Sequence, residues 1–118
     1  PEIKAYPKIG FGYAKKAEAL IYIPGLKKPF KISSDKLKID PLNQDLTFEG
    51  NVKVTTSKGM LTTNFLNFNR NRWELSSFDE YTFKTPASTI QGRSLHGSAQ
   101  KRTLTLFQHH KPTKTLIF

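Results

Sequence analysis

Two small clusters hold the side chains of this sequence that could catalyse a reaction or bind a metal ion. His109 and His110 are adjacent, and Glu74, Asp79 and Glu80 lie closest together among the carboxylates. Adjacent residues on a strand point to opposite faces, so the two histidines need a bend to bind one metal ion. A solvated strand end explains the carboxylates without acid–base chemistry. We therefore expect no catalytic residue, no metal site and no cofactor, and we interpret the chain as a protein that is not an enzyme.

The usual catalytic and nucleotide-binding motifs are also missing from the sequence. It has no nucleophile elbow, zinc-protease or P-loop motif, and Gly10-Phe11-Gly12 lacks the third glycine of a dinucleotide loop. The absence of cysteine excludes disulfides, thiol catalysis and cysteine-ligated zinc.

The charge of the chain favours an anionic partner. Nineteen Lys and Arg residues oppose nine Asp and Glu, and the net charge is +5 over residues 1–40, −1 over 41–80 and +6 over 81–118. Nucleic acid, anionic lipid headgroups and a phosphorylated glycolipid all fit such a field. A basic β-barrel-like module that stacks bases on exposed aromatic rings is one interpretation. However, Phe48, Phe68, Trp73 and Phe83 fall on the apolar side of their strands, which makes nucleic acid the less favoured partner.

Alternating apolar and polar residues predict that strands position these side chains. Leu46, Phe48, Val52 and Val54 share one parity of a run whose other parity is polar, and Gly50 in its middle predicts a bulge or bend. Similar pairs recur to the end of the chain, Trp73 with Leu75 among them. We expect an all-β fold with no helix longer than two turns.

A 29-residue repeat organises the expected strands. Residues 35–40 (DKLKID) recur as 64–69 (NFLNFN) and more weakly as 93–98 (RSLHGS), and each copy precedes a polar turn and a second apolar pair. Residues 16–22 are a candidate degenerate first copy. A lone hairpin cannot bury its apolar face, so the copies must share an interior. This predicts a single domain over 1–118, with 1–29 its weaker part: an antiparallel, open β-jellyroll of repeated hairpins.

Residues 46–54 (LTFEGNVKV) resemble the signature of the OstA-like superfamily of lipopolysaccharide-transport β-jellyrolls. Residues 33–40 fit the strand that precedes this signature, and residues 61–68 followed by 88–95 are similar to the LptC family in particular, with the LptA family second. The likeness covers about residues 30–107. The order and spacing of the motifs carry it more than any one of them.

The resemblance implies a V-shaped carrier in the periplasm, anchored to the inner membrane if an N-terminal helix precedes Pro1. Its interior would hold the acyl chains of lipopolysaccharide, and it would join like domains and the inner-membrane export complex edge to edge, in a bridge toward the outer membrane. Residues 114–118 are expected to form a short apolar strand without an evident hairpin partner, which would be either one such docking edge or an ordinary last strand of the sheet. A homo-oligomer through strand edges is a further expectation. The same apolar residues would also line a closed core. The expected groove comprises Leu37, Ile39, Leu46, Phe48, Val52, Val54, Leu66, Phe68, Trp73, Leu75, Phe83 and Ile90, and the expected headgroup rim Lys53, Arg70, Arg72, Lys84 and Arg93.

Overall fold

The computed structural model describes residues 2–6, 13–23, 25–40, 42, 45–108 and 111–118, so Gly10-Phe11-Gly12 and the pair His109-His110 lie outside the described residues. Every regular element within this part of the chain is a strand. The strands are β1 (Glu2–Tyr6), β2 (Tyr13–Tyr22), β3 (Phe30–Asp40), β4 (Asp45–Thr55), β5 (Met60–Asn69), β6 (Glu74–Lys84), β7 (Thr89–Ser98), β8 (Thr103–Gln108) and β9 (Lys111–Ile117).

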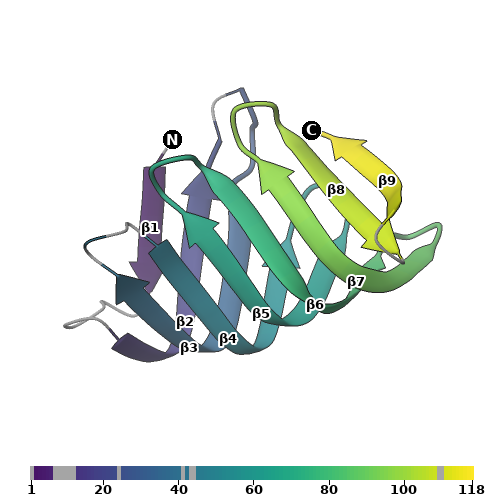
Figure 1. Ribbon diagram of the computed structural model, residues 1–118. Helices are drawn as coiled ribbons and strands as arrows, with labels where there is room; N and C mark the ends of the chain where they lie inside the picture. The colour runs from purple at the N-terminus through teal and green to yellow at the C-terminus, as the bar shows by residue number, and fades with distance from the viewer. Residues whose placement is uncertain (1, 7–12, 24, 41, 43–44, 109–110) are drawn as a thin grey trace.

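The nine strands form one antiparallel sheet in sequence order, β1 to β9, and each pairs with its neighbours along the chain. The prediction of an all-β, open antiparallel jellyroll is confirmed. Figure 1 shows that β4 to β7 bend at the lower edge of the view, so that the two halves of each strand belong to two walls facing one another.

A line of register shifts across the middle of the sheet accounts for the bend. Shifts interrupt the pairing of β3 with β4, β4 with β5, β5 with β6, and β6 with β7. Bulges bend the strand that carries them and increase its twist. The predicted bulge at Gly50 is confirmed: Gly50 (φ 78°) and Asn51 (φ 46°) lie where the pairing with β5 is lost, and Asn51 Nδ2 donates to Asp35 Oδ2 at 2.9 Å.

Buried hydroxyl groups support the backbone along this line. Ser34 Oγ donates to the Lys36 carbonyl and Thr63 Oγ1 to the Glu80 carbonyl, each at 2.7 Å. Ser77 Oγ accepts the Asp79 amide at 3.1 Å. A bulge removes backbone groups from the sheet ladder, and a neighbouring hydroxyl is a compact replacement partner. Among the described residues, no buried side-chain nitrogen or oxygen is left without a hydrogen bond.

The 29-residue repeat is confirmed at the turns. Its copies are the hairpins β3–β4, β5–β6 and β7–β8, and equivalent side chains cap two of their turns: Asn69 Oδ1 accepts the Arg72 amide at 2.9 Å and Ser98 Oγ accepts the Lys101 amide at 3.2 Å. At the other end of the strands, Thr56 and its equivalent Thr85 each accept two backbone amides of their own turns. Residues 16–22 are not a further copy, because they run toward the end opposite the repeated turns.

Trp73 departs from its predicted place. It is the last residue of the turn between β5 and β6, not a strand residue, and its φ of 56° is left-handed. Arg102, 29 residues later, ends the equivalent turn with φ 54°. Non-glycine residues avoid this region at a cost of about 1–2 kcal/mol. For Trp73 the packing of the indole offsets this cost, since it stands edge-on against Phe68 with ring centroids 5.3 Å apart.

Candidate functional site: the apolar interior and its mouth

The apolar residues predicted to line a groove come together between the two walls. Ile39, Trp73 and Ile90 are partly buried and all the others are buried. They belong to one cluster that joins both halves of the bent strands, with Leu37, Leu46 and Leu75 on one side of the bend and Val54 and Phe83 on the other. The fold thus assembles one apolar interior from residues far apart in the sequence.

This interior is filled by its own side chains. Phe48, Phe68 and Phe83 are at most 1% exposed, as close packing across both walls requires. A hydrocarbon chain could therefore occupy this interior only if the two walls separated. The apolar side chains would then contact the bound hydrocarbon in place of one another.

A narrow apolar slot of about 20 Å³ remains at the top of the interior. Phe118 covers it: the ring stands edge-on to Phe30 with centroids 4.9 Å apart, and its amide donates to the Arg102 carbonyl at 2.8 Å. The Lys58 ammonium lies 5.8 Å from the centroid of the same ring. The lining includes Ile21, Ile23, Phe30, Phe68, Trp73, Leu75, Leu104 and Phe118.

We call this end of the molecule the mouth: the turns 70–73 and 99–102 of one wall, and the loop 23–29 and turn 56–59 of the other. The Arg102 guanidinium packs on Gly25, where a Cβ would lie 2.6 Å from Nη1, and Gly25 itself has φ +86°. On the first wall, the Ala99 amide donates to the Trp73 carbonyl at 2.9 Å. A few contacts between turns therefore hold the mouth closed.

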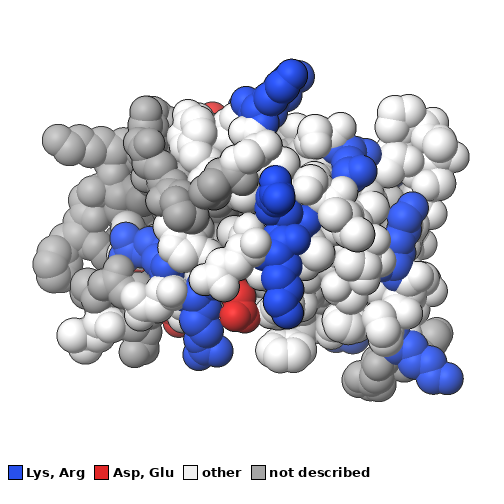
Figure 2. Space-filling view, turned by 90° about the horizontal axis from the view of Figure 1, so that it is seen from above, with Lys and Arg blue, Asp and Glu red and all other residues white. Residues whose placement is uncertain are grey.

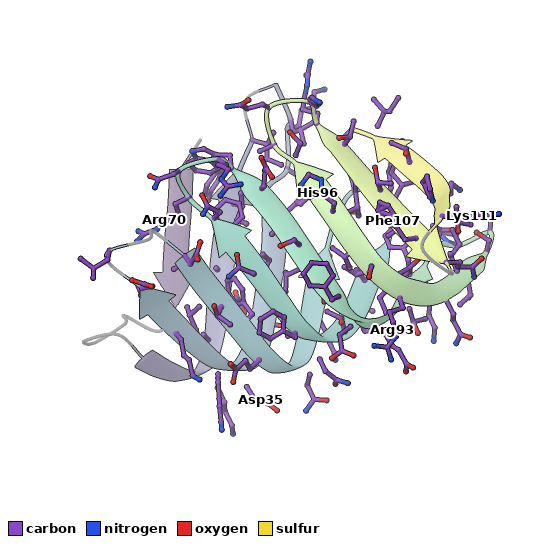
Figure 3. All side chains as sticks on the ribbon, in the orientation of Figure 1. Asp35, Arg70, Arg93, His96, Phe107 and Lys111 are labelled. Atoms are coloured by element: carbon purple, nitrogen blue, oxygen red, sulfur yellow. The ribbon has the colours of Figure 1, made fainter. Side chains whose placement is uncertain are left out.

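The residues predicted as one basic rim do not come together. Lys53 and Arg93 line a surface depression of about 900 Å³. Their side chains lie on the outer face of the sheet, in the same row as those of Thr62 and Thr82. Arg93 also pairs with Glu80, Nη2 to Oε1, at 3.2 Å. Arg70 and Arg72 belong to the turn 70–73 in one wall of the mouth, whereas Lys84 ends β6 beside the turn 56–59 of the other wall, where its carbonyl lies against Gly59. Figure 3 shows Arg70 and Arg93 in widely separated places.

Besides Arg70 and Arg72, the structure brings further cations to the mouth. Figure 2 looks down on this end and shows basic side chains across its middle with few acidic ones. Sequence reasoning missed them because they come from the tips of turns on opposite walls, which only the bend brings together. The 29-residue repeat held a signal for part of this set. It aligns Lys101 and Arg102 with Arg72 and Trp73, and so indicates that they occupy an equivalent turn. The set, which we call the basic collar, is Lys27, Lys28, Lys58, Lys101 and Arg102, all exposed.

Strand edges are the second feature that can contact a partner. In the described part of the chain, β1 and β9 each pair on one side only, and β9 is exposed from Lys111 to Thr115. The C-terminal residues 114–117 form the last strand of the sheet, one of the two expected alternatives, and they have the hairpin partner that the sequence did not show, because β9 pairs with β8. The first half of β7 also pairs only with β6, since its ladder with β8 begins at Leu95.

The side chains first considered for chemistry are in surface contacts. Glu74 Oε2 and His96 Nε2 are 2.9 Å apart, and the Asp79 carboxylate accepts the Glu80 amide at 2.8 Å. Burial raises the pKa of the Tyr81 phenol, which donates to the Phe107 carbonyl at 2.9 Å. No cluster of three His, Cys, Asp or Glu that could hold a metal ion occurs among the residues described.

Comparison with known protein families gives a match over nearly the whole chain. The profile of the family described as "Lipopolysaccharide-assembly, LptC-related" matches residues 1–114. No curated protein matches the chain. Across the described ranges, no helix has the length and apolar character needed to cross a membrane.

Proposed function

The chain belongs to the LptC-related family of lipopolysaccharide-assembly proteins, and from this premise we propose that it carries the acyl chains of lipopolysaccharide between its two walls. Membership assigns the chain a role in lipopolysaccharide transport. The observation that carries the finer proposal is one continuous apolar cluster that spans both walls and ends in an apolar slot at the mouth. We treat the whole chain, residues 1–118, as one carrier domain without a catalytic step.

Loading requires the walls to part, and the energetics allow it. Each acyl methylene removed from water contributes about 0.8 kcal/mol, so six buried methylenes contribute about 5 kcal/mol. Two free-energy costs oppose this gain. Opening breaks the contacts between turns at the mouth, and the acyl chain displaces packing between the walls. Because acyl groups substitute for apolar side chains as neighbours, the opened interior stays dry while it is loaded.

Passage to the next carrier would use the strand edges. An unpaired edge offers backbone N–H and C=O groups that a like domain can extend as a further strand. The edges at β1 and β9 are the two ends of the sheet, so one domain can contact a neighbour on each side. We place this bridge in the periplasm, with the inner-membrane export complex on one side and the outer membrane beyond the other.

A nucleic-acid-binding module is less well supported. Stacking platforms need exposed rings, whereas Phe48, Phe68 and Phe83 are buried and only Phe78, at 81%, has a largely exposed ring among the described aromatic residues. No observation on the outer face favours this function over lipid carriage.

Photo-crosslinking tests the carrier proposal. A photoreactive phenylalanine analogue at Phe68, inside the walls, is expected to capture lipopolysaccharide through its acyl chains. The same analogue at Lys53, whose side chain is exposed on the outer face, serves as the control and is expected not to capture them. Equal capture at both positions, or none at either in a folded protein, would show that the interior remains a closed core.

A further inference from the structure

The basic collar at the mouth is the strongest feature that the acyl-chain proposal leaves unused. Lys27 and Lys28 come from the loop between β2 and β3, Lys58 from the turn after β4, and Lys101 and Arg102 from the turn after β7. Two walls therefore contribute cations to one end of the molecule, and the Arg102 guanidinium packs across the mouth on Gly25, two positions before Lys27.

These cations are not neutralised within the described part of the protein. The ion pairs found there lie elsewhere: Lys31 with Glu18, Lys38 with Glu49, Arg93 with Glu80, and His96 with Glu74. No described collar residue takes part in one. Unpaired charges of one sign over a low-dielectric interior produce a local positive potential that attracts anions.

The collar lies directly over the apolar slot. Arg102 belongs to the slot lining, and the Lys58 ammonium stands above the ring of Phe118, which covers the slot. A ligand bound at this place meets cations first and an apolar passage beneath them. This combination matches an amphiphile with an anionic head and acyl chains.

We propose that the basic collar binds the phosphate groups of the glycolipid while its acyl chains lie between the walls. This inference rests on the carrier function proposed above and adds a headgroup site to it. Arg102 is the anchor, because a guanidinium can donate two parallel hydrogen bonds to one phosphate. Its position is held by the Phe118 amide on its carbonyl and by the packing of its side chain on Gly25.

The lysines add attraction rather than fixed geometry. The lysines of the loop 23–29 and of the turns 56–59 and 99–102 are all exposed to solvent. Salt therefore screens their attraction for a phosphate, with a Debye length of about 8 Å at physiological ionic strength. The collar should thus make binding salt-dependent, whereas the apolar interior should not.

A charge-matched pair of variants tests the collar. Lys58→Gln, Lys101→Gln and Arg102→Gln together remove three collar charges. Lys16→Gln, Lys36→Gln and Lys53→Gln remove three exposed charges away from the turns of the mouth and from the edge strands β1 and β9. Binding of diphosphorylated lipid A and of the same lipid without phosphates is measured by calorimetry at low and physiological salt, after thermal unfolding has shown that both variants are folded.

The expected result is that the collar variant binds diphosphorylated lipid A roughly tenfold more weakly, as the loss of a charge-assisted phosphate contact implies, and dephosphorylated lipid A almost unchanged. The control variant should bind both lipids within about twofold of the unmodified protein. Equal weakening in both variants, or none in either, would overturn the collar but leave the carrier function standing. Failure of the unmodified protein to bind either lipid would instead overturn the carrier function.

Two further probes separate the sources of phosphate. Inorganic phosphate should compete with lipid A only weakly, because it lacks the acyl chains. Competition by phosphate at concentrations similar to the lipid would overturn the assignment to a lipid headgroup in favour of a free anion. Tight binding of a single-stranded oligonucleotide that the collar variant abolishes would overturn it in favour of nucleic acid.

Discussion

The rings of Phe118 and Phe30 meet edge-on with their centroids 4.9 Å apart, and this contact joins the end of the chain to the start of β3 across the mouth. Phe118 is only partly buried, although it covers the slot. The contact is one of those that hold the two walls together at the mouth.

Replacing this side chain tests its part in closure. We expect Phe118→Ala to speed lipid loading in stopped-flow measurements, since the slot loses its cover. The loss of stability in urea unfolding should be about 1–2 kcal/mol, below the ~3–5 kcal/mol typical of a fully buried phenylalanine. Ile117→Ala, at an exposed neighbour, is the control. A Phe118→Ala protein that loads no faster than this control would show that Phe118 does not limit entry.

Gly50 tests the bend. Alanine at this position must adopt φ near +78°, and its Cβ would lie 3.0 Å from Asp35 Oδ2. We expect Gly50→Ala to lower the free energy of unfolding by about 1–3 kcal/mol. Adding Asp35→Ala should restore the steric part of this loss and leave the part due to φ. An unchanged urea midpoint for Gly50→Ala would contradict the role assigned to the bulge.

Tyr81 predicts a loss of stability at alkaline pH. Burial raises the pKa of its phenol in the folded protein above the ordinary value of about 10. The protonated Tyr81 phenol thus makes its full contribution to the free energy of unfolding below pH 10. This contribution is lost as the pH rises from there toward the pKa in the folded protein, because Tyr81 of the unfolded chain releases its proton first. Tyr81→Phe should remove this share of the pH dependence, at a cost of about 1 kcal/mol for the hydrogen bond to Phe107. An identical alkaline slope in the two proteins would count against it.

Opening of the mouth can be measured as a distance. The chain has no cysteine, so Ser57→Cys with Gln100→Cys places two spin labels on turns of opposite walls. Bound lipopolysaccharide should lengthen the distance by roughly 4–5 Å, the contact distance of one acyl chain. Labels at Ser57→Cys and Ala87→Cys, on turns at one end of the same wall, should not move apart. No change in the first pair at saturating lipid would mean that the walls do not separate.

Sequence patterns within single segments predicted the strands and the bulge at Gly50. Alternation predicted the strands because each has one buried and one solvated face, and Gly50 marked its bulge because few other residues adopt its φ. The backbone at Trp73 was not predictable in this way. Alternation with Leu75 is equally compatible with a strand, and the left-handed φ is stabilised by tertiary contacts, the packing on Phe68 and the hydrogen bond from the Ala99 amide to the Trp73 carbonyl.

The candidate site was only partly predictable for a related reason. Parity correctly grouped the residues of the interior, because burial follows the pleat. Exposure, however, does not say which cations are neighbours. Lys53 and Arg93 are both solvent-exposed on the outer face of the sheet, whereas Lys58 and Arg102, 44 positions apart in the sequence, both lie at Phe118 in the mouth.

Fluorescence quenching of Trp73 tests the carriage of acyl chains between the walls most directly. It is the single tryptophan of the chain, and it lines the slot. A glycolipid with brominated acyl chains should quench most of its fluorescence, and the unbrominated lipid at equal saturation should not. In a Trp73→Phe, Phe78→Trp protein the tryptophan replaces the most exposed aromatic residue described, and bromine should leave it unquenched. Saturable binding of the brominated lipid without quenching of Trp73 would contradict the account, because the acyl chains would then lie outside the walls.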